Sequence, residues 1–385
     1  MASVNTLSNA WLVIEHGKIA CYGEGEVIPF SDDEVLDCQG GMVMPAFCDS
    51  HTHLVYAGSR EKEYEDKIRG LSYEEIAKRG GGILNSAKLL SKTSEDELFD
   101  QSLPRALEII RSGTGAVEIK SGYGLKTKDE LKMLRVIRRI AEETDLTIRS
   151  TFLGAHAVPS RFKSDQDKYV QLVIEEMIPA VAEEDLAVFI DVFCDRGFFT
   201  AEQTDRILEA GARYGLVPKI HANELDYSGG VQVGVRHHAR SVDHLEFVGE
   251  EELTALKESG TIPTILPGAS LFLGMSYAPA RSMIEAGLPV ALASDYNPGS
   301  SPSGNMELVM SLGIIQLKML PFEVLNAVTR NGAYAMGLED THGSITPGKV
   351  ASLILTEPMP GFGYMPYSYG SSQIKKVILN GKIQS

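Results

Sequence analysis

The chain has 385 residues, of which 43% are hydrophobic and 23% charged, and its formal net charge is −16. This is the composition of a globular protein, and the length allows two or three domains or one barrel with an appendage. The acidic balance excludes the basic surface of a typical nucleic-acid-binding protein, so we expect no nucleic-acid partner.

The cysteines and the apolar segments indicate where the protein works. The four cysteines include no C-x-x-C pair, and so few in a long chain do not form a disulfide framework, which predicts a cytoplasmic location. No basic segment followed by an apolar stretch opens the chain, so we expect no signal peptide. The most apolar stretch, residues 261–280, is interrupted by three prolines and is not expected to span a membrane.

Both ends of the chain have the pattern of short strands and turns. From about residue 11 to residue 44, apolar runs are separated by Gly-containing turns, and the pattern returns near the C-terminus. We predict that residues 1–44 and 346–385 form one small discontinuous β-sandwich domain. Residues 45–345 are predicted to form the other domain.

Strand-like segments alternate with helical patterns through the middle of the chain. There are eight: 43–53, 115–120, 147–156, 188–194, 217–221, 241–246, 261–266 and 289–295. Such alternation favours an α/β fold of the (β/α)8 TIM-like barrel type over an open doubly wound sheet. No Gly-rich nucleotide-binding motif follows any of these strands, which also argues against a nucleotide-binding sheet.

Capping-box patterns mark the predicted starts of four helices, because their side chains can satisfy the first unpaired amides of a helix. They are Ser72-x-x-Glu75, Ser94-x-x-Glu97, Thr127-x-x-Glu130 and Thr200-x-x-Gln203. Residues 55–112 form a long excursion after the first strand, where substrate-covering structure is expected. The glycine run at 80–82 within it is either a lid hinge or a helix end.

The sequence Asp49-Ser-His51-Thr-His53 lies at the end of an apolar strand. Alternate residues of a strand share a face, so His51 and His53 should point the same way, about 7 Å apart. Two imidazoles at the C-terminal end of a barrel strand can bind one divalent metal ion. An isolated H-x-H pair, however, is more often a chance occurrence on a surface turn.

Other strand ends carry residues of the same kind: His156, His221, His244 and Asp295. Because barrel enzymes draw catalytic groups from several strand ends, this recurrence favours a metallohydrolase over core or capping histidines. The other histidines lie in turn-like or polar contexts and receive no role: His16, His237, His238 and His342.

These segments resemble the amidohydrolase superfamily and, within it, the imidazolonepropionase family over nearly the full chain. The H-x-H motif is common to the superfamily, whereas EIKSGYG at 118–124 and DYNPGSSP at 295–302 are much more specific. The resemblance implies hydrolysis of the ring C–N amide bond of 4-imidazolone-5-propanoate to N-formimidoyl-L-glutamate, a step of histidine degradation. It also suggests a homodimer.

The resemblance implies one Zn²⁺ or Fe³⁺ per chain, with the ligands His51, His53, His221 and Asp295. The implied substrate-binding residues are Arg60, Tyr123, His156, Glu224, Asn297, Gly299 and Ser300. The implied catalytic residues are Glu224, His244, Asp295 and His156, with the general base open among the first three. Dinuclear relatives bridge two metals with a lysine on the fourth strand, and residues 187–195 contain none, so we predict a mononuclear site.

Several alternatives stay open. A guanidinium grips a carboxylate through two hydrogen bonds, so Arg60 suits the propionate, but an exposed loop arginine is equally expected. Tyr123 could donate to substrate or merely pack, and residues 297–299 could form only a turn. The chain could be another mononuclear amidohydrolase, a cyclic amidase or heterocycle deaminase, or an inactive barrel that serves in binding. The short N-terminus suggests that the small domain lacks a strand.

Overall fold

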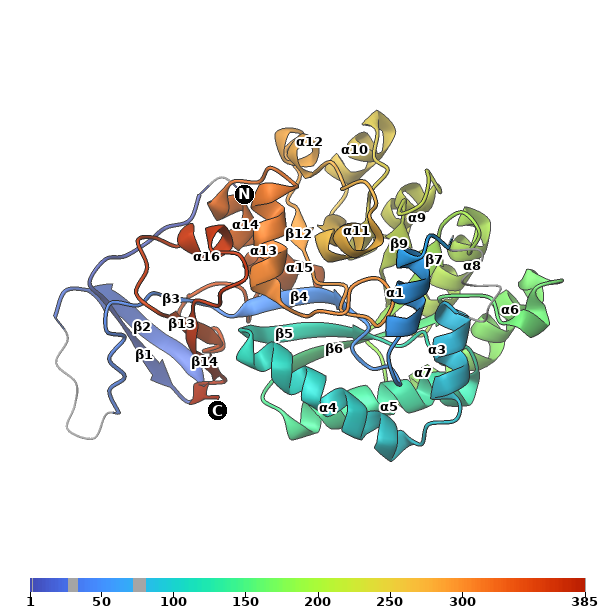
Figure 1. The fold of residues 1–385 in the computed structure, drawn as a ribbon, viewed down its shortest axis with the longest axis horizontal. Helices are drawn as coiled ribbons and strands as arrows, with labels where there is room; N and C mark the ends of the chain where they lie inside the picture. The colour runs from blue at the N-terminus through green and yellow to red at the C-terminus, as the bar shows by residue number, and fades with distance from the viewer. Residues whose placement is uncertain (2, 27–33, 72–80, 385) are drawn as a thin grey trace.

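The computed structural model describes residues 1, 3–26, 34–71 and 81–384. The predicted Ser72 capping box and Gly80 lie outside these residues. Figure 1 shows a barrel flanked on one side by a smaller β layer built from strands near both ends of the chain, while the first residues lie beside α14 (Pro321–Asn326).

Eight strand positions form the barrel, one of them broken into two short pieces. They are β4 (Phe47–Thr52), β5 (Thr114–Lys120), β6 (Thr147–Ala155), β7 (Phe189–Cys194), β8 (Val217–Pro218) with β9 (Ile220–Ala222), β10 (Ser241–His244), β11 (Ile262–Ile265) and β12 (Ala291–Leu292). Neighbours along the chain pair in parallel. The ring closes where Asp295 N donates to His51 O at 3.0 Å and His53 N donates to Tyr296 O at 2.9 Å. The predicted barrel is confirmed, and each strand lies within one residue of its expected segment.

Helices cover the outside of the barrel (Figure 1). Those described are α1 (Glu61–Ile68), α3 (Ile83–Leu90), α4 (Glu95–Arg111), α5 (Thr127–Glu143), α6 (Gln166–Leu172), α7 (Ile178–Glu183), α8 (Ala201–Ala212), α9 (Gly230–Arg236), α10 (Glu250–Lys257), α11 (Pro267–Leu273), α12 (Ala280–Glu285), α13 (Met306–Ile315), α14 (Pro321–Asn326), α15 (Gly332–Ala335) and α16 (Tyr364–Tyr367). Because helices pack on their outer face, strands β4, β5 and β7 are buried at every position.

Two of the predicted capping boxes are present and one is wrong. Ser94 Oγ accepts the amide of Glu97 at 3.2 Å at the start of α4, and Thr200 caps α8 in the same way. Helix α5 does begin at Thr127, but no side chain caps it. The carboxylate of Glu130 accepts instead from three amides of the loop before the helix, which have no other partner among the described residues.

The two ends of the chain fold against each other beside the barrel. Strands β1 (Ala10–Glu15) and β2 (Lys18–Glu24) pair antiparallel. A second sheet has the order β15 (Lys382–Ile383), β14 (Ile374–Leu379), β13 (Leu353–Thr356) and β3 (Val43–Pro45). The two sheets enclose Ile19, Ala351, Leu353 and Ile378.

The first predicted strand, 43–53, is therefore divided. Its opening residues form β3 in the terminal sheet, and the barrel strand β4 starts only at Phe47. The terminal sheet is confirmed, whereas the domain limits at residues 44 and 346 stay a prediction.

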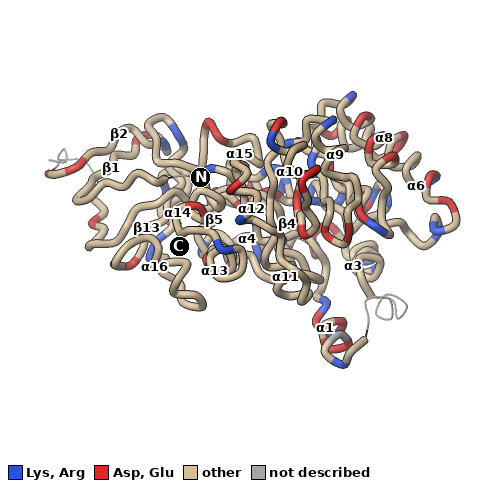
Figure 2. Tube along the Cα trace, turned by 90° about the horizontal axis from the view of Figure 1, so that it is seen from above, with Lys and Arg blue, Asp and Glu red and all other residues tan. Residues whose placement is uncertain are grey.

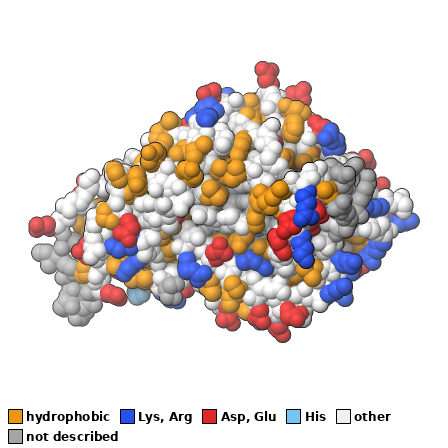
Figure 3. Space-filling model, in the orientation of Figure 1, with side chains coloured by type: hydrophobic (Ala, Val, Ile, Leu, Met, Phe, Trp, Pro, Cys, Tyr) orange, Lys and Arg blue, Asp and Glu red, His pale blue; other side chains and the backbone are white. Residues whose placement is uncertain are grey.

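The outer surface has mixed charges along the helices and a hydrophobic patch over α13, α14 and α16. Acidic and basic residues alternate along the outer helices (Figure 2). Hydrophobic side chains gather over α13, α14 and α16 (Figure 3), where Tyr367 is 73% exposed and Leu320 48% exposed. Among the described residues, no helix combines the length and the apolar character that crossing a membrane requires.

Candidate active site

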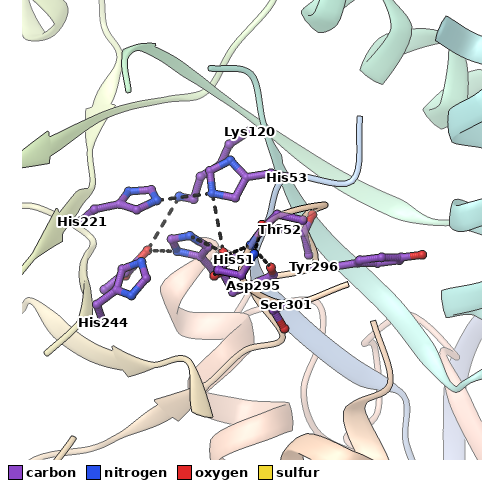
Figure 4. A network of polar contacts seen from close by, with 12 residues as sticks. His51, Thr52, His53, Lys120, His221, His244, Asp295, Tyr296 and Ser301 are labelled. Atoms are coloured by element: carbon purple, nitrogen blue, oxygen red, sulfur yellow. Dashed lines mark hydrogen bonds and ion pairs between the residues drawn. The ribbon is translucent and has the colours of Figure 1, made fainter. Parts of the chain in front are cut away.

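Four of the histidines predicted from the strand ends, His51, His53, His221 and His244, converge at the C-terminal edge of the barrel (Figure 4). His51 lies near the end of β4, His53 just after it, and His221 on β9. The ring centroids of His51 and His221 are 4.5 Å apart, and each of these rings lies within 5.4 Å of the His53 ring. One nitrogen from each ring falls within 4.8 Å of the other two.

Asp295 completes this cluster from the segment after β12. Its Oδ1 atom lies 3.6 Å from His51 Nε2 and 3.7 Å from His53 Nε2. The backbone of Asp295 has φ +53°, a left-handed conformation that a non-glycine residue rarely adopts. Such strain is common where a fold holds a side chain in one functional position.

The cluster fits a metal ion. His51 Nε2 is buried and has no hydrogen-bond partner among the described residues, whereas Nδ1 of the same ring lies 2.6 Å from Asp243 Oδ2. A buried polar atom without a partner is costly, and an ion would satisfy it. Burial, followed by nearby cationic groups, holds the pKa of both His51 and His53 well below the usual value. The rings are therefore neutral, as metal ligands must be.

The loop after Asp295 is folded around a single side chain. Asn297 Oδ1 accepts the amides of Gly299 and Ser300, both at 2.8 Å, and Asn297 Nδ2 donates to Asp295 O at 2.6 Å. Ser300 Oγ donates to Asp295 Oδ2 at 3.1 Å. Residues 297–299 do form a turn, and this turn fixes the orientation of the Asp295 carboxylate.

A second group of titratable side chains lies beside the metal-type cluster. His244 Nδ1 is 3.7 Å from Glu224 Oε2 and 3.9 Å from Glu246 Oε2. Burial, followed by the charge of Glu246, raises the pKa of Glu224 well above its usual value. Burial also raises the pKa of Glu246 to about 8. The group can therefore store a proton near neutral pH and release it to a bound molecule.

His156 and Tyr123 form the wall on the other side of His53. The His156 and His53 rings are stacked with centroids 5.0 Å apart, and the Tyr123 ring lies 5.3 Å from His156. Both side chains are buried. His156 Nδ1 lies 3.0 Å from Gly122 O and donates to it, which leaves Nε2 as the free acceptor of this ring.

Arg60 reaches the site from the loop before α1. Its Nε atom donates to Glu63 Oε2 at 2.8 Å, and its side chain is only 12% exposed. An alanine Cβ at Gly299 would lie 2.0 Å from Arg60 Nη1. The arginine is thus held against the loop that carries Asp295, and it is not the freely exposed loop residue that composition alone allowed.

Comparisons with known proteins identify the family of this chain. The amidohydrolase family model matches residues 42–384. The chain is 54% identical over 384 residues to the imidazolonepropionase of Christiangramia forsetii, and the match covers 100% of this chain and 93% of that protein. The imidazolonepropionase of Geobacillus kaustophilus is 43% identical, with 100% and 92% covered. The chain belongs to the imidazolonepropionase family of amidohydrolases.

Solved structures show how widely the fold of this imidazolonepropionase family member is shared. A 5-methylcytosine deaminase from Klebsiella pneumoniae superposes with a TM-score of 0.75 at 17% identity, covering 97% of this chain and 93% of that one. A zinc complex of atrazine chlorohydrolase from Arthrobacter aurescens gives a TM-score of 0.71 at 16% identity, with 98% and 90% covered. At such identities the likeness concerns the fold alone.

The charged residues beneath the histidines of this imidazolonepropionase family member were not predicted from the sequence. They are Glu118, Lys120, Asp191, Lys219 and Asp243, and Glu246 was also missed at the side of the site. A signal was present, since each of the first five interrupts an otherwise apolar strand segment. Charged groups are almost never fully buried unless they are paired, so their positions in buried strands could have predicted a network.

Proposed function

We propose that this protein hydrolyses the ring C–N amide bond of 4-imidazolone-5-propanoate to give N-formimidoyl-L-glutamate. The observation that carries the proposal is the convergence of three buried imidazoles and Asp295 at one edge of the barrel, within reach of an arginine. Family membership supports the substrate, because relatives over the full chain length are imidazolonepropionases.

One metal ion per chain, zinc or iron, would be held by His51, His53, His221 and Asp295. When bound it supplies a Lewis acid that polarises a carbonyl oxygen and acidifies a water molecule. Imidazole and carboxylate ligands suit both metals, so the donor set does not choose between them.

The chain's own residues then move the protons. Asp295 accepts a proton from the attacking water, whose oxygen forms a bond to the ring carbonyl carbon. The C–N bond then breaks, and the leaving ring nitrogen takes a proton from Glu224 through the adjacent His244. Glu224 Oε2 and His244 Nδ1 lie 3.7 Å apart. His156, whose Nδ1 donates to Gly122 O, keeps Nε2 available to accept a hydrogen bond from the substrate.

Arg60 binds the propionate group of the substrate. A guanidinium can form two parallel hydrogen bonds to a carboxylate, and Glu63 already holds one edge of the group in place. Tyr123, Asn297, Gly299 and Ser300 line the remaining contact surface. Tyr123 supplies a phenol hydroxyl, and the turn at 297–300 packs against the guanidinium of Arg60.

The proposal is tested by following loss of the imidazolone absorbance with purified protein before and after treatment with a chelator. We expect turnover that chelation abolishes and added zinc or iron restores. Arg60→Ala should raise KM at least tenfold, whereas Arg69→Ala, at an exposed arginine paired with Glu65, should leave KM unchanged. Ammonia release from an aminated heterocycle without turnover of imidazolone propanoate would instead identify a deaminase.

Two further properties belong to the same proposal. The enzyme acts in the cytoplasm, in keeping with its few scattered cysteines. It acts as a homodimer, and light scattering on the purified protein would give the mass of a monomer if this assignment is wrong.

A further inference from the structure

Five charged side chains lie directly beneath the histidine cluster, and each is completely buried. They are Glu118 and Lys120 on β5, Asp191 on β7, Lys219 between β8 and β9, and Asp243 on β10. Removing charges from water costs several kcal/mol per ion unless each has a close partner of opposite sign. We therefore expect each of these five charges to contact a group of opposite charge.

The five groups are paired with one another. Lys120 Nζ lies 2.6 Å from Glu118 Oε1, 2.8 Å from Asp191 Oδ2 and 3.7 Å from Asp243 Oδ2. Lys219 Nζ donates to Glu118 Oε2 and to Ser50 O, and it lies 3.9 Å from Asp243 Oδ2. Three carboxylates and two ammonium groups leave the cluster with one net negative charge.

Two of these carboxylates also contact the proposed metal ligands. Asp243 Oδ2 lies 2.6 Å from His51 Nδ1. Asp191 Oδ2 lies 2.9 Å from His221 Nδ1, and its Oδ1 accepts the backbone amide of His221 at 3.1 Å. The Asp243 carboxylate accepts the proton of His51 Nδ1, so the lone pair of His51 Nε2 is left to face the cluster. The His221 Nδ1 contact to Asp191 lacks the angle of a hydrogen bond, but the nearby carboxylate favours a proton on the same ring atom.

Lys120 joins the two contacts, because the Asp191 and Asp243 oxygens nearest to it are the ones that face the histidines. His53 differs from these two ligands, since among the described residues no carboxylate pairs with its Nδ1, whereas Asp191 Oδ2 lies 2.9 Å from His221 Nδ1. The network thus acts on the proposed ligands His51 from β4 and His221 from β9.

We propose that Asp191 and Asp243, held by Lys120, are positioning residues that fix the tautomer and ring orientation of His221 and His51 for metal binding. The inference rests on the proposed metal centre. It adds that the affinity for the metal depends on Asp191, Asp243 and Lys120, none of which is a proposed ligand.

The test measures zinc affinity in the full-length protein, using metal-free protein titrated with Zn²⁺ against a chromophoric chelator. Asp243→Asn and Asp191→Asn should each weaken zinc binding about 10- to 100-fold, the range typical for loss of such outer partners. The visible bands of the Co²⁺-loaded protein should also shift in both variants, because the orientation of a ligand ring changes. A role confined to folding would move neither readout.

Two further variants keep the test decisive. Ser241→Ala removes the hydroxyl that donates to Asp243 Oδ1 but retains every charge, so it should fold and show a smaller, several-fold loss. Glu252→Gln is the matched control. Glu252 is a buried carboxylate that contacts Gly249 N and Gln232 and no histidine, and its zinc affinity should stay within about twofold of the parent.

Zinc affinity within threefold of the parent in folded Asp191→Asn and Asp243→Asn proteins would overturn the positioning role while leaving the metal centre intact. Failure of the parent itself to bind zinc or iron would remove the metal centre and the inference with it. The two failures are therefore distinguishable.

Discussion

At position 299 the three atoms nearest to an added Cβ atom would all belong to the guanidinium of Arg60. The contact joins two loops more than 200 residues apart in the chain. Each residue was predicted separately, from its resemblance to a family motif. Their contact could not be predicted, because it depends on how the segment before α1 folds over the segment after β12.

Gly299→Ala tests this contact. The methyl group should push Arg60 out of position while the flexible side chain moves away at little cost to folding. We expect KM for imidazolone propanoate to rise about tenfold with kcat nearly unchanged, because ground-state and transition-state binding of the propionate weaken together. Gly361→Ala, where an added Cβ meets no atom within 4 Å, is the control and should match the parent. A fall in kcat with constant KM would contradict the assignment.

The contacts of the buried charges could not be predicted either, because they join residues far apart in the chain. The strand-end histidines were predictable because a single strand places alternate residues on one face. The partner of His51, Asp243, lies 192 residues away along the chain, and no local pattern specifies which carboxylate a given imidazole will meet. The sequence therefore predicted which histidines cluster but not the network of charges beneath them.

Among the secondary-structure elements, α4 and α5 show how one sequence pattern leads to two structures. Both begin with a capping-box sequence, and only Ser94 caps its helix. Glu130, which should complete the second box, faces the amides of Gly122, Gly124 and Leu125 in the preceding loop. No local sequence pattern indicates that these loop amides need the Glu130 carboxylate as a partner. The contact arises from tertiary packing, which here overrides the local prediction of a capping box.

Alanine substitutions at the two positions should therefore differ. Ser94→Ala removes a side chain that accepts the Glu97 amide, and it should lower the free energy of unfolding by about 1 kcal/mol. Thr127→Ala removes a hydroxyl that donates to exposed Glu176 and caps nothing, so its effect should stay within about 0.5 kcal/mol. Urea unfolding of both variants measures the difference. Equal losses would show that Thr127 caps α5 after all.

Glu130 also predicts a pH dependence. Burial raises its pKa to about 7, against the opposing effect of its hydrogen bonds to Ser121 and the loop amides. A pKa raised in the folded state means that the folded protein binds the proton more tightly, so this stabilisation is complete below the unfolded pKa and is lost as pH rises towards 7. Tyr169, which faces Glu130 from α6, titrates outside this window because burial raises its pKa well above the usual value.

Comparison of the parent with Glu130→Gln isolates this titration from those of other buried acids. The free energy of unfolding of the parent, minus that of the variant, should fall by on the order of 2 kcal/mol between about pH 5 and about pH 8. Urea unfolding at a series of pH values provides the measurement. A difference that stays constant, or grows with pH, would show that Glu130 is ionised throughout the range.

In the molecule as a whole, the proposed ligands come from the first, fifth and eighth strand positions of the barrel. Alternating strands and helices predicted the barrel, since that pattern leaves few other ways to bury both faces of a parallel sheet. The closure of the barrel depends on backbone bonds between β4 and the segment after β12. An ion bound there would hold together parts of the chain nearly 250 residues apart, at the point where the ring closes.

Metal removal should therefore lower the stability of the whole fold as well as abolish activity. A ligand that binds only the folded state adds about 2.7 kcal/mol when its free concentration is 100 times Kd, which corresponds to several degrees in Tm for a protein of this size. We expect the melting temperature to fall after chelation and to recover with micromolar Zn²⁺. Mg²⁺ should not restore it, because that ion prefers oxygen ligands and the cluster offers mainly imidazole nitrogens. A melting temperature that ignores zinc while activity depends on it would place the ion at a site that does not bridge the barrel closure.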